Sequence, residues 1–434
     1  SRGMDNRFSR LTGLLPNKVY YFVIKDDNST SARFSFRTIP DVPTERLSII
    51  AGGDSRSNST PRRNGNLMVA KLRAHAVLFG GDMTEFDTNG EWQTWFDDWQ
   101  LTIAPDGRMT AIIPARGNHE YSSTVVEELF DVNSSDIYFA NTFGGSLFRA
   151  YTLNSNIATG GAQASWLSSD LAANANVIWK ASQYHHPMRP HTSSKPERND
   201  IYSDWLPSFE QYGMNLAIEC DAHLVKHTYP VKSSSVLGSQ EGFVRDDLNG
   251  IVYIGEGCWG APLRAPDDGK SWTREMDAFN QFHLIYIEIN KIEIRCVGVD
   301  NAPSVGQLDD NSRFTMPANI DIWQAPTGNV IIIENYRIAG RPDVTLVNPL
   351  NGQSFTGLNT IPLIALASDT DGGTVDSVQF FVNGEYVGSA TLANGTFRFD
   401  WTPTERGIYN VYAKAFDNDG KINRTAGVWI TVHT

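Results

Sequence analysis

Residues 46 to 335 alternate six short apolar runs with helix-like stretches. The runs are LSIIAGG, HAVLFGG, TAIIPARG, NVIWKASQY, MNLAIEC and GIVYIGEG. Between them, RRNGNLMVAKLRAH, NGEWQTWFDDWQLTIA and GAQASWLSSDLAAN carry apolar residues near helical spacing. Short apolar runs that alternate with helices are typical of α/β folds in which helices cover the sheet. This part of the chain is therefore predicted to be an α/β domain.

Two stretches of different texture flank this region. Residues 1–40 hold two strand-like runs, RLTGLLPNKVYYFVIKDD and ARFSFRTIP. Because two strands cannot bury a core alone, we expect them to be the end of a larger β-domain. The last part has short strand-like runs separated by Asn-Gly and Asp-Gly turns, which is typical of a β-sandwich. The predicted domains are residues 1–40, 41–338 and 339–434.

Charge and composition restrict the partners and the cell compartment. A net charge of -13 argues against a nucleic-acid partner, because phosphate repulsion would not be offset. No apolar run reaches the length of about 18 residues that a membrane span needs. The chain starts at Ser1 without a signal peptide, so we expect a secreted or extracytoplasmic protein whose export signal was removed or lies outside this chain.

The three cysteines, Cys220, Cys258 and Cys296, contain no CxxC pair. Their number and spacing predict neither a disulfide framework nor a thiolate zinc site. One bridge, between Cys220 and Cys258, stays open as an alternative.

Polar residues with metal-binding side chains follow five of the apolar runs. In chain order they are Asp54, Asp82, Asn118 with His119, His185 with His186, and Asp221 with His223. Each alone is explained by turn chemistry or by a structural histidine. In α/β sheets, however, the carboxyl ends of the strands line one crevice, so these side chains should converge. Together they predict a site for divalent metal.

The ordered set GGDSR, FGGDMTEF, RGNHEY, HHP and IECDAHLVKHTYP resembles the calcineurin-like metallophosphoesterases, and especially their purple acid phosphatase branch. GIVYIGEGCWG is similar to the same branch, LTGLLPNKVYYF is similar to the end of its fibronectin-like domain, and the tail resembles a bacterial Ig-like module. The resemblance implies an α/β fold: a metallophosphoesterase-type β-sandwich flanked by helices, preceded by a fibronectin-like end and followed by an Ig-like sandwich.

The resemblance also implies roles for the residues that match these motifs. Asp54 would bind a first metal and Asp82 would bridge two metals. Asn118, His185 and His223 would hold the second metal. His119 would act as general acid or transition-state donor. In the phosphoesterase hypothesis, His186 is a further candidate for assisting the leaving group.

Three departures from the family pattern alter these expectations. Glu85 stands where the purple branch has an iron-binding tyrosine, so no purple iron centre is expected. Ala222-His223-Leu224-Val225 aligns with the family's Gly-His-x-His, which places Val225 at the position of a first-metal ligand. Arg56 stands in the first motif where other branches have the histidine of Asp-x-His, and its charge there would disfavour a metal and favour a bound anion.

Two metal hypotheses remain. In one, Asp54, Asp82 and Glu85 make an oxygen-rich first site for Mn, Mg or Ca beside the second site. In the other, which the missing histidine and Arg56 favour, a single divalent ion such as Zn lies on the second site alone. The Asp-Gly segments DTDGG and DNDG of the tail could hold calcium, although turns explain them as well.

Basic and aromatic residues near these motifs predict binding of an anionic substrate. The basic residues of this set are Arg116, Arg189, His191, Lys226 and His227, in a chain that is otherwise acidic. Tyr121, Tyr184 and Trp259 are candidates for the pocket wall, with Tyr184 also a candidate catalytic group.

Three functions are compatible with this sequence. The first is a secreted phosphoesterase that cleaves a small or polymeric anionic ester with a metal-activated water. The second is a polysaccharide lyase that cleaves a uronate-containing or sulfated glycan by β-elimination, with one cation and a His or Tyr base. The third is a non-catalytic binding protein.

Overall fold

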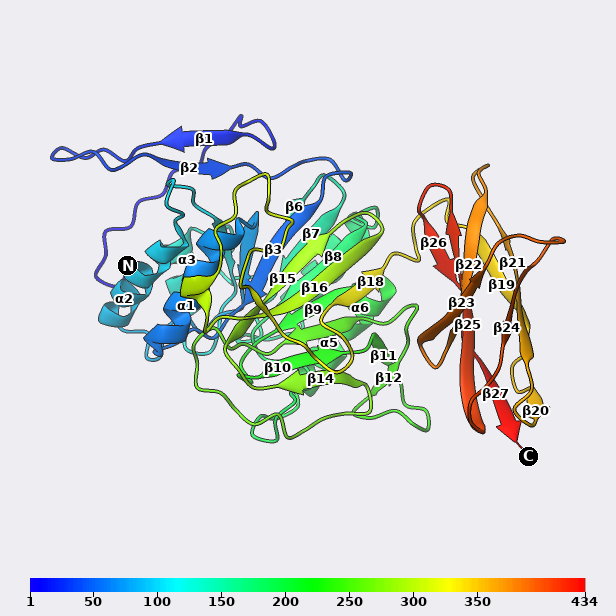
Figure 1. The fold of residues 1–434 in the computed structure, drawn as a ribbon. Helices are drawn as coiled ribbons and strands as arrows, with labels where there is room; N and C mark the ends of the chain where they lie inside the picture. Colours follow the sequence, from blue (N-terminus) through cyan, green and yellow to red (C-terminus); the bar gives the residue numbers. More distant parts are fainter. Residues whose placement is uncertain (434) are drawn as a thin grey trace. The chain divides into compact units, whose positions relative to one another are not determined.

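Two seven-stranded sheets pack face to face in residues 1–333, the first of the two units into which the chain divides (Figure 1). The computed structural model describes residues 1–433. One sheet runs in the order β17 (Asp321–Ile322), β16 (Lys291–Gly298), β15 (Gln281–Ile287), β3 (Leu47–Gly52), β4 (Ala76–Phe79) and β5 (Ala111–Pro114), with β18 (Ile331–Glu334) beside β16. The other runs β14 (Thr273–Asp277), β10 (Val225–Thr228), β13 (Val252–Gly255), β9 (Leu216–Glu219), β8 (Trp179–Gln183), β7 (Phe148–Thr152) and β6 (Phe139–Phe143).

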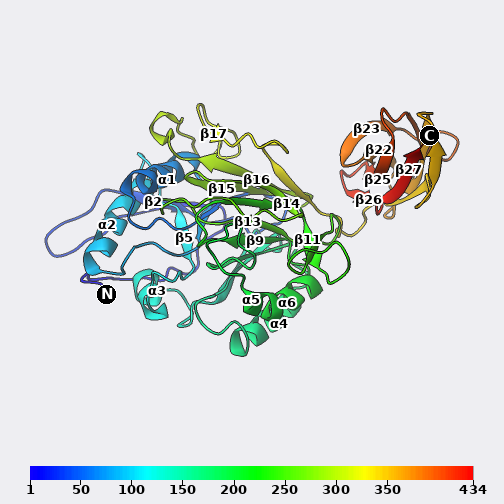
Figure 2. The same cartoon turned by 90° about the horizontal axis from the view of Figure 1, so that it is seen from below.

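Helices cover the outer face of each sheet, which gives four layers (Figure 2). On one side lie α1 (Ser59–Leu72), α2 (Asn89–Trp99) with the short helix η1 (Gln100–Thr102), and α3 (Ser123–Phe130). On the other lie α4 (Ala162–Ala173), α5 (Asn199–Asp204) and α6 (Leu206–Gln211). Every residue of β3 is buried, because Ile49 and Ala51 face the other sheet while Ile50 faces the helices. The predicted helical stretches correspond to α1, α2 and α4.

The strands that precede the polar residues are parallel, as the sequence predicted, but they belong to two sheets. β3, β4 and β5 are parallel neighbours in one sheet. β7, β8, β9 and β13 are parallel neighbours in the other. The carboxyl ends of both sets can therefore contribute to one site.

Residues 1–40 are part of the first unit. β1 (Val19–Phe22) and β2 (Phe34–Arg37) form a two-stranded sheet of their own. Ser35 joins this sheet to the segment before β5, by donating its N–H to the Gly107 carbonyl and accepting the N–H of Met109. A second small sheet pairs β11 (Val231–Ser233) with β12 (Phe243–Arg245), and η2 (Ala302–Ser304) is a short 3₁₀ helix.

The second unit, from residue 334 onward, is a β-sandwich, as the sequence predicted. One sheet contains β19 (Asp343–Asn348), β21 (Ile361–Ser368) and β24 (Phe397–Trp401). The other contains β20 (Ser354–Thr356), β27 (Val428–His433), β25 (Gly407–Asp417), β22 (Val375–Val382) and β23 (Glu385–Ala390), with β26 (Ile422–Arg424) beside β25.

The candidate calcium segments of this unit form turns. Asp369 Oδ1 accepts the N–H groups of Asp371 and Gly372, and Asp417 Oδ1 accepts those of Asp419 and Lys421. The Lys421 ammonium forms an ion pair with Asp371, so a lysine neutralises one of the carboxylates that had been considered for calcium.

Two further expectations concern cysteines and membranes. Cys220, Cys258 and Cys296 are buried and free, so the open alternative of a Cys220–Cys258 bridge is wrong. Among residues 1–433, none of the helices combines the length and the apolar character that a bilayer crossing requires.

Candidate functional site

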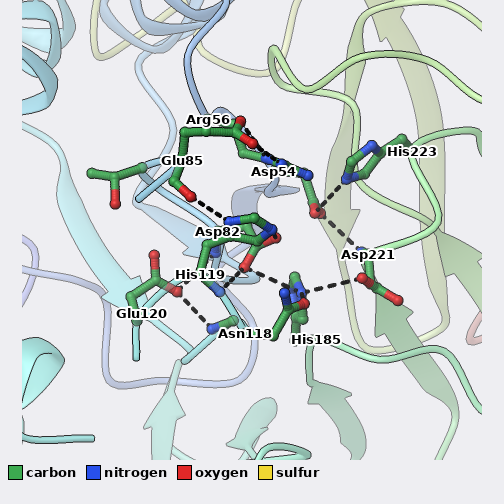
Figure 3. Close-up of polar contacts among 12 residues, drawn as sticks. Asp54, Arg56, Asp82, Glu85, Asn118, His119, Glu120, His185, Asp221 and His223 are labelled. Atoms are coloured by element: carbon green, nitrogen blue, oxygen red, sulfur yellow. Dashed lines mark hydrogen bonds and ion pairs between the residues drawn. The ribbon is translucent and has the colours of Figure 1, made fainter. Parts of the chain in front are cut away.

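Five strand ends bring their polar residues together at one edge of the two sheets (Figure 3). In this group Asp54, Asp82, His185, Asp221 and His223 have exposed fractions between 0 and 4%. Carboxylates and imidazoles at this depth are costly unless they bind a partner. The predicted convergence is therefore confirmed for the strand ends, and the group requires a ligand or a proton to balance it.

Backbone strain is concentrated in this group. Asp54, Asp82, Asp221 and His223 have positive φ angles between 55° and 66°. Non-glycine residues rarely adopt this left-handed conformation, and where they do, the surrounding structure imposes it, often at a binding or catalytic site. Four such residues at the ends of three strands indicate that side-chain position is being fixed here.

One half of the site consists of Asp54 and His223. His223 Nδ1 donates to the Pro262 carbonyl at 2.8 Å, which directs Nε2 toward Asp54. The distance from Nε2 to Asp54 Oδ1 is 3.2 Å, yet both atoms are buried without a hydrogen-bond partner, as is Asp82 Oδ2. Two ligands bound tetrahedrally to one ion at about 2.1 Å lie about 3.4 Å apart. The pair is thus spaced as metal ligands are.

The other half surrounds His185. Its Nδ1 donates to the Gly80 carbonyl at 3.0 Å, so Nε2 points inward. Three oxygens face this nitrogen, from Asn118 at 3.0 Å, Asp82 at 3.3 Å and Asp221 at 3.7 Å. Ligand atoms of Asp54, Asp82 and His185 lie within 4.8 Å of one another, so the two halves are adjacent and Asp82 is near both.

The electrostatics of the His185 half favour a cation. Burial opposes a charge on His185, but the carboxylates of Asp82, Asp54 and Asp221 outweigh it and raise the pKa of His185 to about 10. Burial by itself would raise the pKa of Asp82, but His185 and His119 outweigh it and hold this pKa well below its usual range. The field that retains a proton on His185 would also attract a metal ion in its place.

Glu120 and two glycines position the loops that carry the carboxylates. Both oxygens of the fully buried Glu120 accept backbone N–H groups, from Asp82 and Gly117 on one oxygen and from Met83 on the other. A Cβ on Gly117 would lie 2.1 Å from Asp82 Oδ1, and one on Gly257 would lie 1.9 Å from Asp54 Oδ2. Only glycine fits beside each carboxylate.

His119 and His186 are candidates for proton transfer. His119 Nδ1 donates to the Glu85 carbonyl at 2.5 Å, and its Nε2 lies 3.7 Å from Asp82 Oδ2. The side chain of His119 is 20% exposed, which leaves it open to a substrate. Burial, with the charge of His185, lowers the pKa of His186 to about 3, and its Nδ1 lies 3.0 Å from Ser155 Oγ.

Three cations border the site. Arg56 forms a two-pronged ion pair with Glu85, so Glu85 is committed to that arginine. Lys195 Nζ donates to Asp221 Oδ1 at 2.5 Å, and Arg264 donates to the Asp221 carbonyl at 2.6 Å. Sequence reasoning found Arg56 but missed the other two, although Lys195 follows the HHP motif by eight residues and Arg264 follows GIVYIGEGCWG by four.

The expected register of the last motif is wrong by two residues. His223 lies against Asp54, the expected first-metal residue, and not with His185. Asp221, which was not assigned as a ligand, faces His185 instead. Val225 lies buried in β10. The spacing of the residues could have suggested this placement. Asp221 and His223 are two residues apart, as are the two histidines of the family's His-x-His.

Five other expectations fail because the side chains are buried and bonded elsewhere. Lys226 forms ion pairs with Glu219 and Glu256, and the Tyr184 hydroxyl donates to Glu219 at 2.7 Å. The remaining three are Arg189, whose Nε donates to the Glu241 carbonyl, His191, whose Nε2 lies 2.7 Å from Thr273 Oγ1, and His227, whose Nε2 lies 2.8 Å from His283 Nε2. Proximity in sequence to a ligand did not place these groups at the site.

Three residues named for the pocket have other surroundings. Arg116 donates to the carbonyls of Glu120 and Tyr121, so it stabilises the loop after Asn118. Tyr121 is 61% exposed. Trp259 is fully buried against Phe79 and Phe282 in the core.

Comparison with known proteins gives the following relationships. A search of curated protein sequences found no match. Residues 342–422 match the family model of a bacterial Ig domain. Among solved structures, purple acid phosphatase PPD1 from yellow lupin (Lupinus luteus) seeds is similar at 16% identity and a TM-score of 0.56, over 69% of this chain and 60% of the lupin chain.

Two further phosphatase structures are similar at lower scores. PhoD matches at 12% identity and a TM-score of 0.48, over 76% of this chain and 79% of its own. A dimetal phosphatase from Danio rerio matches at 10% identity and a TM-score of 0.40, over 68% of this chain and 99% of its own. The lupin match, with the two-sheet architecture, shows that the first unit has the metallophosphoesterase fold of the purple acid phosphatases, and the second unit is an Ig-like domain of bacterial type.

Proposed function

We propose that the first unit is a metal-dependent phosphoesterase-type hydrolase that cleaves an anionic ester at the edge where the strand ends meet. The observation that carries this proposal is the set of buried, unpartnered ligand atoms: Asp54 Oδ1, Asp82 Oδ2 and His223 Nε2. A folded protein rarely leaves such atoms unsatisfied, so each needs an explanation. A divalent cation between them satisfies all three.

The residues present suit two divalent ions. Asp54 and His223 would hold one ion, Asn118, His185 and Asp221 would hold the other, and Asp82 would contact both. This mixture of carboxylate, amide and imidazole donors suits Zn or Mn better than a soft metal. When bound, such a pair of ions neutralises the ester's charge and lowers the pKa of a water molecule between them.

His119 is proposed to assist the leaving group. Because its Nδ1 donates to the Glu85 carbonyl, the ring is held with Nε2 toward Asp82. In its protonated form, Nε2–H can donate to the oxygen that departs with the alcohol. Glu85 thus contributes through its backbone carbonyl, while its carboxylate holds Arg56.

Arg56, Lys195 and Arg264 are proposed to select an anionic substrate, small or polymeric. They border the site from three separate loops and give it local positive charge in a chain whose net charge is -13. An acidic protein that gathers cations around one edge concentrates anions there. The bacterial Ig domain supports an extracytoplasmic location as part of the same proposal.

The test is turnover of aryl esters by the metal-loaded full chain. Aryl phosphomonoesters, phosphodiesters and sulfate esters are compared by release of the phenol, with wild type beside His119→Asn. We expect one ester class to be cleaved, and the His119 variant to be slowed about 100-fold or more, as for loss of a general acid. Absence of turnover on all three classes, with the metal content verified, would overturn the proposal.

The alternative of a polysaccharide lyase that acts by β-elimination loses one of its two candidate bases. Tyr184, its tyrosine base, is completely buried and donates to Glu219. An unsaturated, ultraviolet-absorbing product from a uronate-containing glycan would restore that hypothesis, and it is measured in the same preparations.

A further inference from the structure

Two histidines and a cysteine converge in the core without sharing a residue with the strand-end site. Ligand atoms of His227, His283 and Cys296 lie within 4.8 Å of one another. Their exposed fractions are 5%, 1% and 2%. We propose that these three side chains bind a transition-metal ion of the zinc class, which fastens the two sheets of the first unit together.

The register of β15 and β16 shows how unusual this position is. These strands pair antiparallel, with Ile287 opposite Ile292 and Ile285 opposite Ile294. All four isoleucines belong to the core between the sheets. The next pair in the same row is His283 opposite Cys296. Because alternate residues of a strand share a face, this pair points into the same core as the isoleucines.

His227 reaches the pair from the opposite sheet. It lies in β10, which pairs with β13 and β14, whereas β15 and β16 belong to the sheet of β3 (Figure 1). The Nε2 atoms of His227 and His283 are 2.8 Å apart, and only one of the two can donate a hydrogen bond to the other. An ion held by all three residues would therefore join strands that no backbone hydrogen bond joins.

The chemistry of the three donors defines the ion. His227 and His283 are both buried, and burial favours the neutral imidazole, which has a lone pair to offer. Two imidazoles and a thiolate suit zinc and similar borderline ions and exclude Mg and Ca, which take oxygen ligands. Binding replaces the thiol proton with the metal: Cys296–SH and M²⁺ give the Cys296 thiolate–metal bond and one released proton.

The surroundings favour a structural role for this ion. Three protein ligands leave a fourth position, as in open zinc sites, but the burial of all three ligands keeps a substrate away from it. The Trp323 ring packs against the His227 ring at 5.2 Å between centroids, and the backbone N–H of Trp323 donates to the Cys296 carbonyl. Cysteine spacing gave no hint of this site, because each of its ligands lies on a different strand.

The test uses cobalt as the probe, supplied in the growth medium so that it is present while the full chain folds. Cobalt bound to a thiolate gives a near-ultraviolet charge-transfer band, and the proposed strand-end ligands include no sulfur. We expect wild type to show the band. Cys296→Ser should lose the band and one metal ion per chain, while Cys258→Ser, a change at another buried cysteine, should keep both.

Two further results make the test decisive. Asp82→Asn should keep the band, because the proposed ion does not depend on the strand-end site or on any hydrolytic activity. If Cys296→Ser does not fold, the band in Asp82→Asn still tests whether the ion binds independently of the strand-end site. A wild-type protein without the band, a band that survives Cys296→Ser, or a band that disappears in Asp82→Asn would each overturn the proposal.

Discussion

His223 Nε2 and Asp54 Oδ1 lie 3.2 Å apart, buried, and without a hydrogen-bond partner on either atom. This pair occupies one half of the strand-end site, and Asp221 takes the place beside His185 that was expected for His223. The expectation of a depleted first site rested on Val225 and on Arg56, and the first of these two arguments is weakened because His223 lies against Asp54. The arrangement motivates the two-ion proposal.

His223→Gln is expected to remove one metal ion per chain and to reduce hydrolysis by more than 100-fold. Loss of an outer-shell partner costs about 10- to 100-fold in metal affinity or activity, and loss of a ligand exceeds that. Elemental analysis and initial rates measure the two effects. The control is His191→Gln, another buried histidine, whose Nε2 lies against Thr273 rather than the site. Unchanged metal content in His223→Gln would remove His223 from the ligand set.

Gly257→Ala is expected to impair the site without removing any polar group. Its φ is 73°, and the added Cβ would lie 1.9 Å from Asp54 Oδ2, so the carboxylate must move. A displacement of about 1 Å at a reacting centre can cost about 100-fold in rate. Gly161→Ala is the matched control, because its φ of 63° imposes similar backbone strain with no atom within 4 Å of the new Cβ. Equal activity of the two variants would contradict the role given to Gly257.

Lys195→Gln is expected to raise KM for the anionic ester about tenfold and to leave kcat nearly unchanged. A hydrogen bond to a charged group contributes about 1.5 to 3 kcal/mol, and Lys195 reaches the site edge with 21% of its side chain exposed. Steady-state kinetics separate the two constants. A fall in kcat at constant KM would mean that Lys195 acts by holding Asp221 and not by binding substrate.

The stability of the first unit is expected to fall in acid, in part through His75. Burial, with Arg313 and Arg108 nearby, lowers the pKa of His75 to about 3, while Nδ1 accepts the Ser48 N–H. Below pH 6.5, His75 therefore binds a proton in the unfolded chain, whereas in the folded chain it stays neutral until about pH 3. The stabilisation is complete above pH 6.5, is lost as the pH falls toward 3, and amounts to about 5 kcal/mol.

His75→Asn keeps an acceptor for the Ser48 N–H and removes the titration. Melting temperatures of wild type and His75→Asn, followed from pH 7 to pH 4, should show a shallower decline in the variant. Parallel declines would show that other groups control the acid sensitivity.

The strand ends could be predicted from the sequence because each depends on a local pattern. An apolar run followed by Gly and Asp predicts where β3 and β4 end, and it places Asp54 and Asp82 in the loops directly after these strands. The register of Asp221 and His223 could not be predicted in the same way, because an aspartate can replace a histidine as a ligand and both assignments fit one sequence. The geometry decides between them through the Pro262 carbonyl, which orients His223.

The substrate-binding predictions failed for a different physical reason. Lys226 and His227 are near His223 in sequence, but they enter β10, where every residue is buried. Two buried glutamates, Glu219 and Glu256, are paired with Lys226, and no local pattern reveals that these partners come from β9 and from the loop after β13. Conversely, Lys195 and Arg264 lie 26 and 43 residues from Asp221 along the chain and yet contact it.

The number of metal ions that depend on Asp82 tests the central claim most directly. Elemental analysis of wild type and Asp82→Asn, prepared in the same medium, gives the difference per chain. Because ligand atoms of Asp82 lie within 4.8 Å of those of both Asp54 and His185, the account predicts that the variant loses two ions together with its hydrolytic activity. A loss of one ion, or of none, would contradict a site in which Asp82 joins two metals.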